Sequence, residues 1–153
     1  MKSQDLTFSF TVQQTPAEVF AAINDVAGWW TGEITGVTDR LGGEFTYRYK
    51  DMHRSTQQIT EWVPGKKVVW NVTQSNLSFV KDKHEWTGTD MVFEISRRGG
   101  KTELTFTHVG LTPNVECYGG CSKGWDYIIN ECLLAFITSG KRAPSANEDW
   151  KAA

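Results

Sequence analysis

A histidine near the end of one alternating segment has the side chain best suited to acid–base chemistry. His108 follows Leu104 and Phe106 at a spacing of two, so its imidazole is predicted to face the apolar side of a strand. There it could act as an acid, as a base or as a hydrogen-bond donor to a ligand. No nucleophile stands beside it, and the competing interpretation is a structural histidine satisfied by the backbone or by a tyrosine. His53 and His84 are interpreted as loop residues.

Three cysteines near one end of the chain give weaker signals. Cys117 and Cys121 would share one face of a helix, and His108 could add a third metal ligand. Zinc sites typically carry paired Cys-x-x-Cys or Cys/His clusters, so we predict no metal site and no cofactor. A redox role for Cys117 and Cys121 stays open, because a helix N-terminus lowers a thiol pKa. With Cys132 the number is odd, which favours reduced thiols in the cytoplasm.

Aromatic residues are abundant, with seven Trp, eight Phe and four Tyr in 153 residues. Trp and Tyr combine an apolar body with a polar tip, which suits a pocket that holds and orients a mostly hydrophobic ligand. The same rings could instead fill a close-packed core, and both interpretations stay open at this point. The residues predicted to line a ligand cavity are Phe45, Tyr47, Tyr49, Trp70, Trp86, Phe93, Phe106, His108, Trp125 and Ile129.

Several classes of function find no support in the sequence. The glycine pairs lack phosphate-binding spacing, and neither a Gly-x-Ser-x-Gly elbow nor a His-Glu-x-x-His pair is present. The net charge is -2 and basic residues occur in ones and twos, so we expect no nucleic-acid partner. No apolar stretch approaches the ~20 residues that a membrane span requires, and the N-terminus lacks the apolar run of a signal peptide. We therefore expect a cytoplasmic protein without a membrane span.

Periodicity predicts the elements that would position these residues. Alternation over 6–12 indicates a strand, and Thr15 to Glu18 forms a capping box that begins a short helix, with a further helical turn near Val26. Turn residues then separate a series of strands up to His108, which favours an antiparallel meander. The segment 74–85 has no sustained period and is predicted to be a long loop. The residues predicted to face inward are Phe45, Tyr47, Tyr49, Val68, Trp70, Val72, Met91, Phe93, Ile95, Leu104, Phe106 and His108.

The last predicted element is a long amphipathic helix. Apolar residues recur at spacings of three and four from Trp125 onward, and Gly140 stands where a left-handed cap belongs. We predict a helix from about 122 to 139, with Gly119 and Gly120 breaking or kinking any helix that begins earlier. The whole forms a single α+β domain over 1–142, followed by a loosely held tail at 143–153.

This order of elements resembles the START-like (SRPBCC) superfamily. The segments that carry the resemblance are Phe-Thr-Val at 10–12, Thr-Pro-Ala-Glu-Val-Phe at 15–20 and Gly-Trp-Trp at 28–30. Within the superfamily, three further segments are similar to homologues of the activator of heat-shock protein 90 ATPase, namely 86–89, 107–111 and 124–125. The resemblance implies a helix-grip fold, as in pollen allergens: six or seven antiparallel strands wrap the C-terminal helix, short helices near 16–30 close one end, and a cavity often lies between.

The superfamily includes lipid carriers, hormone-binding proteins, polyketide cyclases, ring-hydroxylase subunits and chaperone activators, so fold alone does not determine chemistry here. We predict binding of a small hydrophobic or amphipathic molecule in the aromatic cavity, rather than catalysis. One alternative is a cyclase- or hydrolase-type enzyme that uses His108. The other is a module that interacts with a chaperone, which the family name alone suggests.

Overall fold

The computed structural model describes residues 5–30, 32–50, 52–78, 84, 86–112 and 118–141. The predicted tail at 143–153 lies outside the described residues, as does Cys117 with its metal and redox interpretations. The described part contains one sheet and two helical regions, and these position every feature discussed below.

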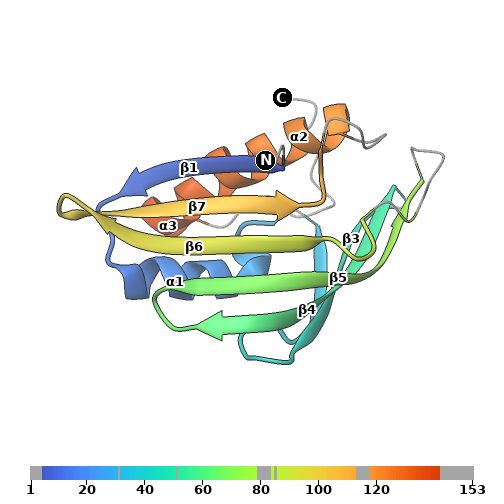
Figure 1. Ribbon diagram of the computed structural model, residues 1–153, viewed down its shortest axis with the longest axis horizontal. Coiled ribbons are helices and arrows are strands. Elements are labelled where there is room, and N and C mark those ends of the chain that lie inside the picture. Colours follow the sequence, from blue (N-terminus) through green and yellow to red (C-terminus); the bar gives the residue numbers. More distant parts are fainter. Residues whose placement is uncertain are drawn as a thin grey trace.

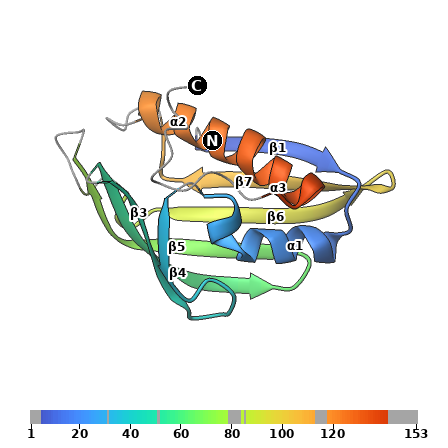
Figure 2. The ribbon, with the colours of Figure 1, turned by 180° about the vertical axis from the view of Figure 1, so that it is seen from behind.

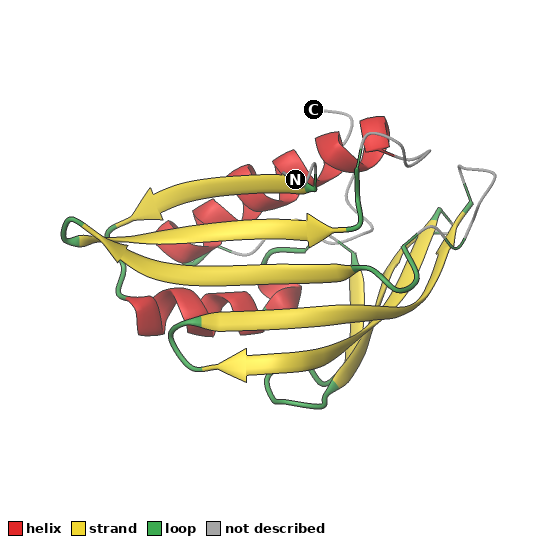
Figure 3. Ribbon diagram, in the orientation of Figure 1, coloured by secondary structure: helices red, strands yellow, loops and turns green. Residues whose placement is uncertain are grey.

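Seven antiparallel strands form a single curved sheet that does not close on itself (Figures 1 and 3). Their order is β1-β7-β6-β5-β4-β3-β2, so the chain makes a meander from β2 to β7 and β1 pairs with the last strand. The strands are β1 (Leu6–Val12), β2 (Glu33–Gly36), β3 (Glu44–Tyr49), β4 (His53–Val63), β5 (Lys67–Leu77), β6 (Asp90–Arg98) and β7 (Lys101–Val109). The predicted α+β helix-grip fold is confirmed.

Two helical regions cover the same face of the sheet, which we call the inner face (Figure 2). The first consists of α1 (Pro16–Asn24) and a short 3-10 turn, η1 (Val26–Gly28). The second consists of α2 (Tyr118–Tyr127), a π-helical stretch η2 (Ile128–Leu133) and α3 (Leu134–Ser139), which follow one another without a gap and together form the C-terminal helix. Both ends predicted from capping chemistry are confirmed. Thr15 Oγ1 accepts the Glu18 N–H at 3.1 Å, and Gly140 is left-handed with φ of 75°.

The C-terminal helix begins four residues earlier than predicted. It starts at Tyr118, and Gly119 and Gly120 lie in its first turn instead of breaking it. Glycine disfavours a helix by only ~1 kcal/mol relative to alanine. Packing of Cys121 and Trp125 against the domain outweighs that preference, since both side chains are buried.

The prediction of a loop from residue 74 was also wrong for its first part, because β5 extends to Leu77. Beyond Ser78, most of the predicted loop lies outside the described residues. The cause is a β-bulge: the pairing with β4 shifts between Thr56 and Gln57, so Thr73 has no partner across the ladder. Val72 and Ser75 are therefore both buried although they are three residues apart, which hides the two-residue period in the sequence.

The inner face of the sheet carries the core. Every residue predicted to face inward is buried, the helices add Val19, Ile23 and Leu133 among others, and the turn after η1 adds Trp29. The short strand β2 is held close to β3 at Gly36, whose φ is 117°. A Cβ atom there would collide with the backbone of Glu44 and Phe45.

We expect Gly36→Ala to lower the free energy of unfolding by ~2 kcal/mol or more, because the backbone is left-handed and the space is filled by main chain. Urea unfolding followed by Trp fluorescence measures this. The control is Gly119→Ala, which lies in a helix with open space around a Cβ atom and should leave stability unchanged or raise it by up to ~1 kcal/mol. Equal effects of the two substitutions would contradict the assignment of a tight contact between β2 and β3.

Candidate ligand pocket

Stacked aromatic rings join the C-terminal helix to the inner face of the sheet. The Trp125 ring lies 4.6 Å from the Phe106 ring of β7 and 5.2 Å from Trp30. Trp30 in turn stacks on Tyr47 of β3, with centroids 4.0 Å apart and planes 9° from parallel. Trp86 stacks on the other side of Trp125 at 5.8 Å. These rings fill the middle of the domain and leave its α2 end open.

A chain of hydrogen bonds runs through this cluster and fixes the state of His108. The Trp125 indole can only donate, and its Nε1–H donates to His108 Nδ1 at 3.0 Å. The neutral imidazole must then carry its proton on Nε2, which donates to Thr89 Oγ1 at 2.8 Å. The series of hydrogen bonds continues through Thr89, whose hydroxyl donates to the Trp86 carbonyl at 2.6 Å. Both ring nitrogens of His108 are therefore occupied within the domain.

Burial keeps this histidine neutral. Its side chain is 0% exposed, and burial, with a smaller contribution from the His53 charge, lowers the pKa of His108 to about 3. Two phenols near the pocket are held in their protonated form in a comparable way. Burial, with the neighbouring Tyr49, raises the pKa of Tyr47 above its ordinary value. Burial and a hydrogen bond with Cys132 raise the pKa of Tyr127 to about 12.

The open end of the domain holds a pocket of about 740 Å³ between α2 and the β3–β4 hairpin, which we call the ligand pocket. Its walls are predominantly apolar, with one amine, that of Lys123. The lining residues are Trp30, Tyr47, Tyr49, Met52, His53, Trp86, Gly120, Cys121, Lys123, Gly124, Trp125, Tyr127 and Ile128. A cavity of this size and polarity is typical of sites for small organic molecules.

Two glycines of α2 leave the helical wall of the pocket without side chains. Gly120 and Gly124 both line it, and a Cβ atom at either position would meet nothing within 4 Å. Neither residue has a positive φ, so the backbone does not require glycine. The helix wall is therefore recessed because these two side chains are missing.

The structure separates the residues predicted to line a cavity into two groups. Tyr47, Tyr49, Trp86 and Trp125 line the ligand pocket. The remaining six are buried in the core and do not line it, namely Phe45, Trp70, Phe93, Phe106, His108 and Ile129. Alternation identifies which residues face inward, but it does not show which part of the interior stays open.

The sequence analysis did not identify most of the α2 residues that line the ligand pocket, or His53 in the β3–β4 hairpin. Cys121 stands four residues before Trp125, so it extends the apolar stripe upstream, and Gly124 stands three residues after Cys121 and four before Ile128. The stripe was not recognised because Gly120 and Gly124 stand where apolar side chains would have continued the pattern. His53 was interpreted as a loop residue, but it is the first residue of β4, opposite Tyr49, and it lines the pocket. The turn at 50–51 after Tyr49 was the signal that could have placed it.

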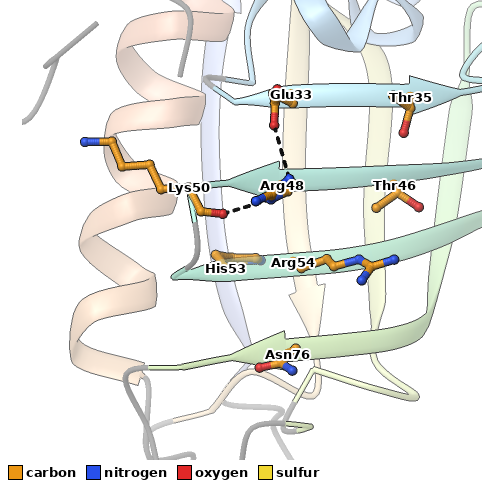
Figure 4. A pocket seen from close by; sticks show the side chains of 8 residues that line it. All are labelled: Glu33, Thr35, Thr46, Arg48, Lys50, His53, Arg54 and Asn76. Carbon is orange, nitrogen blue, oxygen red and sulfur yellow. Dashed lines mark hydrogen bonds and ion pairs between the residues drawn. The ribbon is translucent and has the colours of Figure 1, made fainter. Parts of the chain in front are cut away.

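A second hollow, of about 690 Å³, lies on the outer face of the sheet across β2 to β5 (Figure 4). It is polar, and its most prominent contacts are internal: Arg48 Nη1 lies 4.0 Å from Glu33 Oε1, and Arg48 Nε donates to the Lys50 carbonyl. Exposed pairs of this kind contribute only ~0–1 kcal/mol. The aromatic ligand pocket beside α2 is the stronger candidate site.

The sequence matches the family model described as activator of Hsp90 ATPase homolog 1-like protein over residues 13–134. The chain belongs to this family. No curated protein matches the sequence significantly. Among the residues that the structure describes, no helix is long and apolar enough to span a membrane. The same residues include no group of three or more His, Cys, Asp or Glu side chains that could hold a metal ion.

Solved structures show that the fold is shared at low sequence identity. The Aha1 dimer from Colwellia psychrerythraea has 20% identity and a TM-score of 0.70, over 90% of this chain and 98% of that one. DynU16, from the dynemicin biosynthetic locus, has 15% identity and a TM-score of 0.66 over 94% of this chain, which spans only 51% of DynU16. CalU16 from Micromonospora echinospora has 17% identity and a TM-score of 0.61, over 87% and 74% of the two chains.

We expect the imidazole of His108 to stay neutral in the folded protein from pH 8 down to about 4.5, with its proton on Nε2, because its pKa is about 3. The unfolded chain takes up a proton on this ring below about pH 6.5, whereas the folded chain does not. Stability is therefore fully present above about pH 6.5, and this ring removes up to about 1.4 kcal/mol for each pH unit below it.

Nitrogen-15 NMR of the histidine rings identifies the tautomer directly. Urea unfolding across the same pH range measures how steeply the free energy of unfolding changes with pH. In His108→Gln this pH dependence should be shallower by the contribution of the one proton that the unfolded chain takes up on His108. A His108 ring that titrates near pH 6.5 in the folded protein would contradict the closed hydrogen-bond chain.

Proposed function

We propose that this protein binds one small, largely apolar molecule in the ligand pocket between α2 and the β3–β4 hairpin. The observation that carries the proposal is the recessed, aromatic-walled pocket itself. Its volume of about 740 Å³ falls in the range of ~300–1,000 Å³ that small-molecule sites occupy. The rings of Trp30, Trp86 and Trp125 give the pocket an apolar wall against which a ligand can pack.

The glycines of α2 support the same proposal. Each costs ~1 kcal/mol of helix stability relative to alanine, and nothing in the packing around Gly120 or Gly124 excludes a methyl group. A helix that served only to cover the sheet would gain stability from alanine at both positions. Glycine at both positions is explained if the space beside the helix is used by a ligand.

The geometry of His108 favours binding over catalysis. A general acid or base needs a ring nitrogen within reach of the reacting group, and both nitrogens of His108 are hydrogen-bonded to Trp125 and Thr89. The chaperone-interaction alternative rests on the family description, and no feature of the described surface favours it. The neighbour DynU16, described as part of a biosynthetic locus, fits a fold that handles small organic molecules.

We also propose that the domain covers residues 1–142 and works in the cytoplasm. Cys132 supports that compartment, because it is a buried, free thiol in the described part of the chain. Cys121 lines the ligand pocket, where an oxidising compartment would expose it to side reactions.

A leucine at Gly124 should fill the pocket and block it. We expect the neutral fluorescent probe N-phenyl-1-naphthylamine to bind the wild-type protein saturably at one site, and Gly124→Leu to weaken binding at least about tenfold, equivalent to ~1.4 kcal/mol. The control is Gly119→Leu, on the same helix but outside the lining, which should bind within about twofold of wild type.

Fluorescence titration measures both affinities, and thermal unfolding confirms that both variants fold. Absence of saturable binding to the wild type, or equal loss in the two variants, would overturn the proposed function.

A further inference from the structure

Polar atoms without partners gather on the inner face of β4 and beside it. Gln57 is 0% exposed, and neither its Oε1 nor its Nε2 has a hydrogen-bond partner. Ser55, two residues earlier on the same face, is 1% exposed, and its hydroxyl is also unpartnered. The indole Nε1 of Trp86, a residue that lines the ligand pocket, is buried without a partner as well.

Strand pairing continues this row from the ligand pocket into the core, beyond the residues that line the pocket. His53, Ser55 and Gln57 face inward in turn along β4, and His53 already lines the pocket. Ser55 lies opposite Tyr47, another lining residue, and Gln57 lies opposite Phe45. With ~3.4 Å per residue, the row runs from the pocket to ~14 Å inside the domain. The β-bulge at Gln57 bends the ladder at the inner end of this row.

Unpartnered buried polar atoms lower the stability of the folded protein unless a ligand supplies the missing hydrogen bonds. A buried donor or acceptor without a partner costs ~1–3 kcal/mol, and native proteins contain few of them. Of the seven such side-chain atoms among the described residues, five belong to Ser55, Gln57, Trp70 and Trp86. Trp70 sits on β5 diagonally across from Gln57, since Gln57 pairs with Val72. Of these four residues Trp86 lines the pocket, and the other three lie on the adjoining inner faces of β4 and β5.

From this concentration we infer that the ligand carries a neutral hydrogen-bonding group, such as a hydroxyl or carbonyl, at the end that enters the domain, where Ser55, Gln57 and the Trp86 indole receive it. The inference rests on the proposed function and adds the chemical class of the ligand. The Gln57 amide and the Ser55 hydroxyl can each donate and accept, whereas the indole only donates. A hydroxyl or a carbonyl can pair with such a set.

Charge excludes an ionised group at this end. The buried polar residues of the described chain are Asn24, Ser55, Gln57, Ser75, Thr102 and His108, and they include no carboxylate, ammonium or guanidinium. His108 is neutral and its ring nitrogens are occupied. A carboxylate or amine buried beside Gln57, four residues along β4 from the half-buried His53, would lack a buried counter-charge, which is unfavourable. The ligand's polar group is neutral, while the rest of the molecule contacts the aromatic walls.

The test compares two probes of nearly equal shape, 2-naphthol and 2-methylnaphthalene, which differ by a hydroxyl in place of a methyl group. Their dissociation constants are measured by displacement of N-phenyl-1-naphthylamine from the full-length protein. In Gln57→Met, which keeps the side-chain length and removes the amide, the preference for 2-naphthol should fall at least about fivefold relative to wild type. Comparing ratios cancels the difference in hydrophobicity between the probes.

The matched control is Gln58→Met, the same substitution one residue along β4, outside the inner row. It should leave the ratio within about twofold of wild type. Without ligand, Gln57→Met should unfold at the same temperature as wild type or higher, because it removes unpartnered polar atoms.

An unchanged probe ratio in Gln57→Met overturns the inference and assigns an internal water to Ser55 and Gln57. A large loss of thermal stability in Gln57→Met overturns it too, because the amide would then be part of the fold. If N-phenyl-1-naphthylamine itself fails to bind the wild type, the proposed function fails first, so the two failures are distinguishable.

Discussion

The indole of Trp125 donates a hydrogen bond to His108 inside the domain, and this bond fixes where the C-terminal helix crosses the sheet. Because the indole can only donate, the bond also sets the tautomer of His108 and directs its other nitrogen to Thr89. Trp125 stacks on Trp86 and packs at a tilt against Trp30, which fills the centre of the domain with rings. What stays open is the region beyond those rings, between α2 and the β3–β4 hairpin.

Two local departures from regular structure shape that open region. The β-bulge at Thr73 bends the ladder between β4 and β5. Gly120 and Gly124 remove side chains from the helix that lines the ligand pocket. Both departures reduce stability, and the two glycines lie at the pocket. Local disadvantages of this kind are typical of functional sites in an otherwise consistent fold.

The fold could be predicted from the sequence because its signals are local. Alternation around Phe106, capping at Thr15 and the stripe after Trp125 each depend on a few neighbouring residues. The site depends on tertiary packing, which those signals do not contain. Strand alternation and helical spacing placed Trp70 and Trp125 alike in the predicted cavity, although Trp70 lies in the core and Trp125 lines the pocket. The bulge in β5 shifted the period, and the glycines of α2 interrupted the helical stripe.

The most direct measurement is the position of a bound probe. Nuclear Overhauser effects from N-phenyl-1-naphthylamine to protons of the protein report contacts within about 5 Å, the range of touching side chains. The account predicts cross-peaks to the rings of Tyr49 and Trp125 and to the amide of Gly124, which together surround the pocket. Cross-peaks to Thr46 and Arg54 on the outer face instead would contradict it.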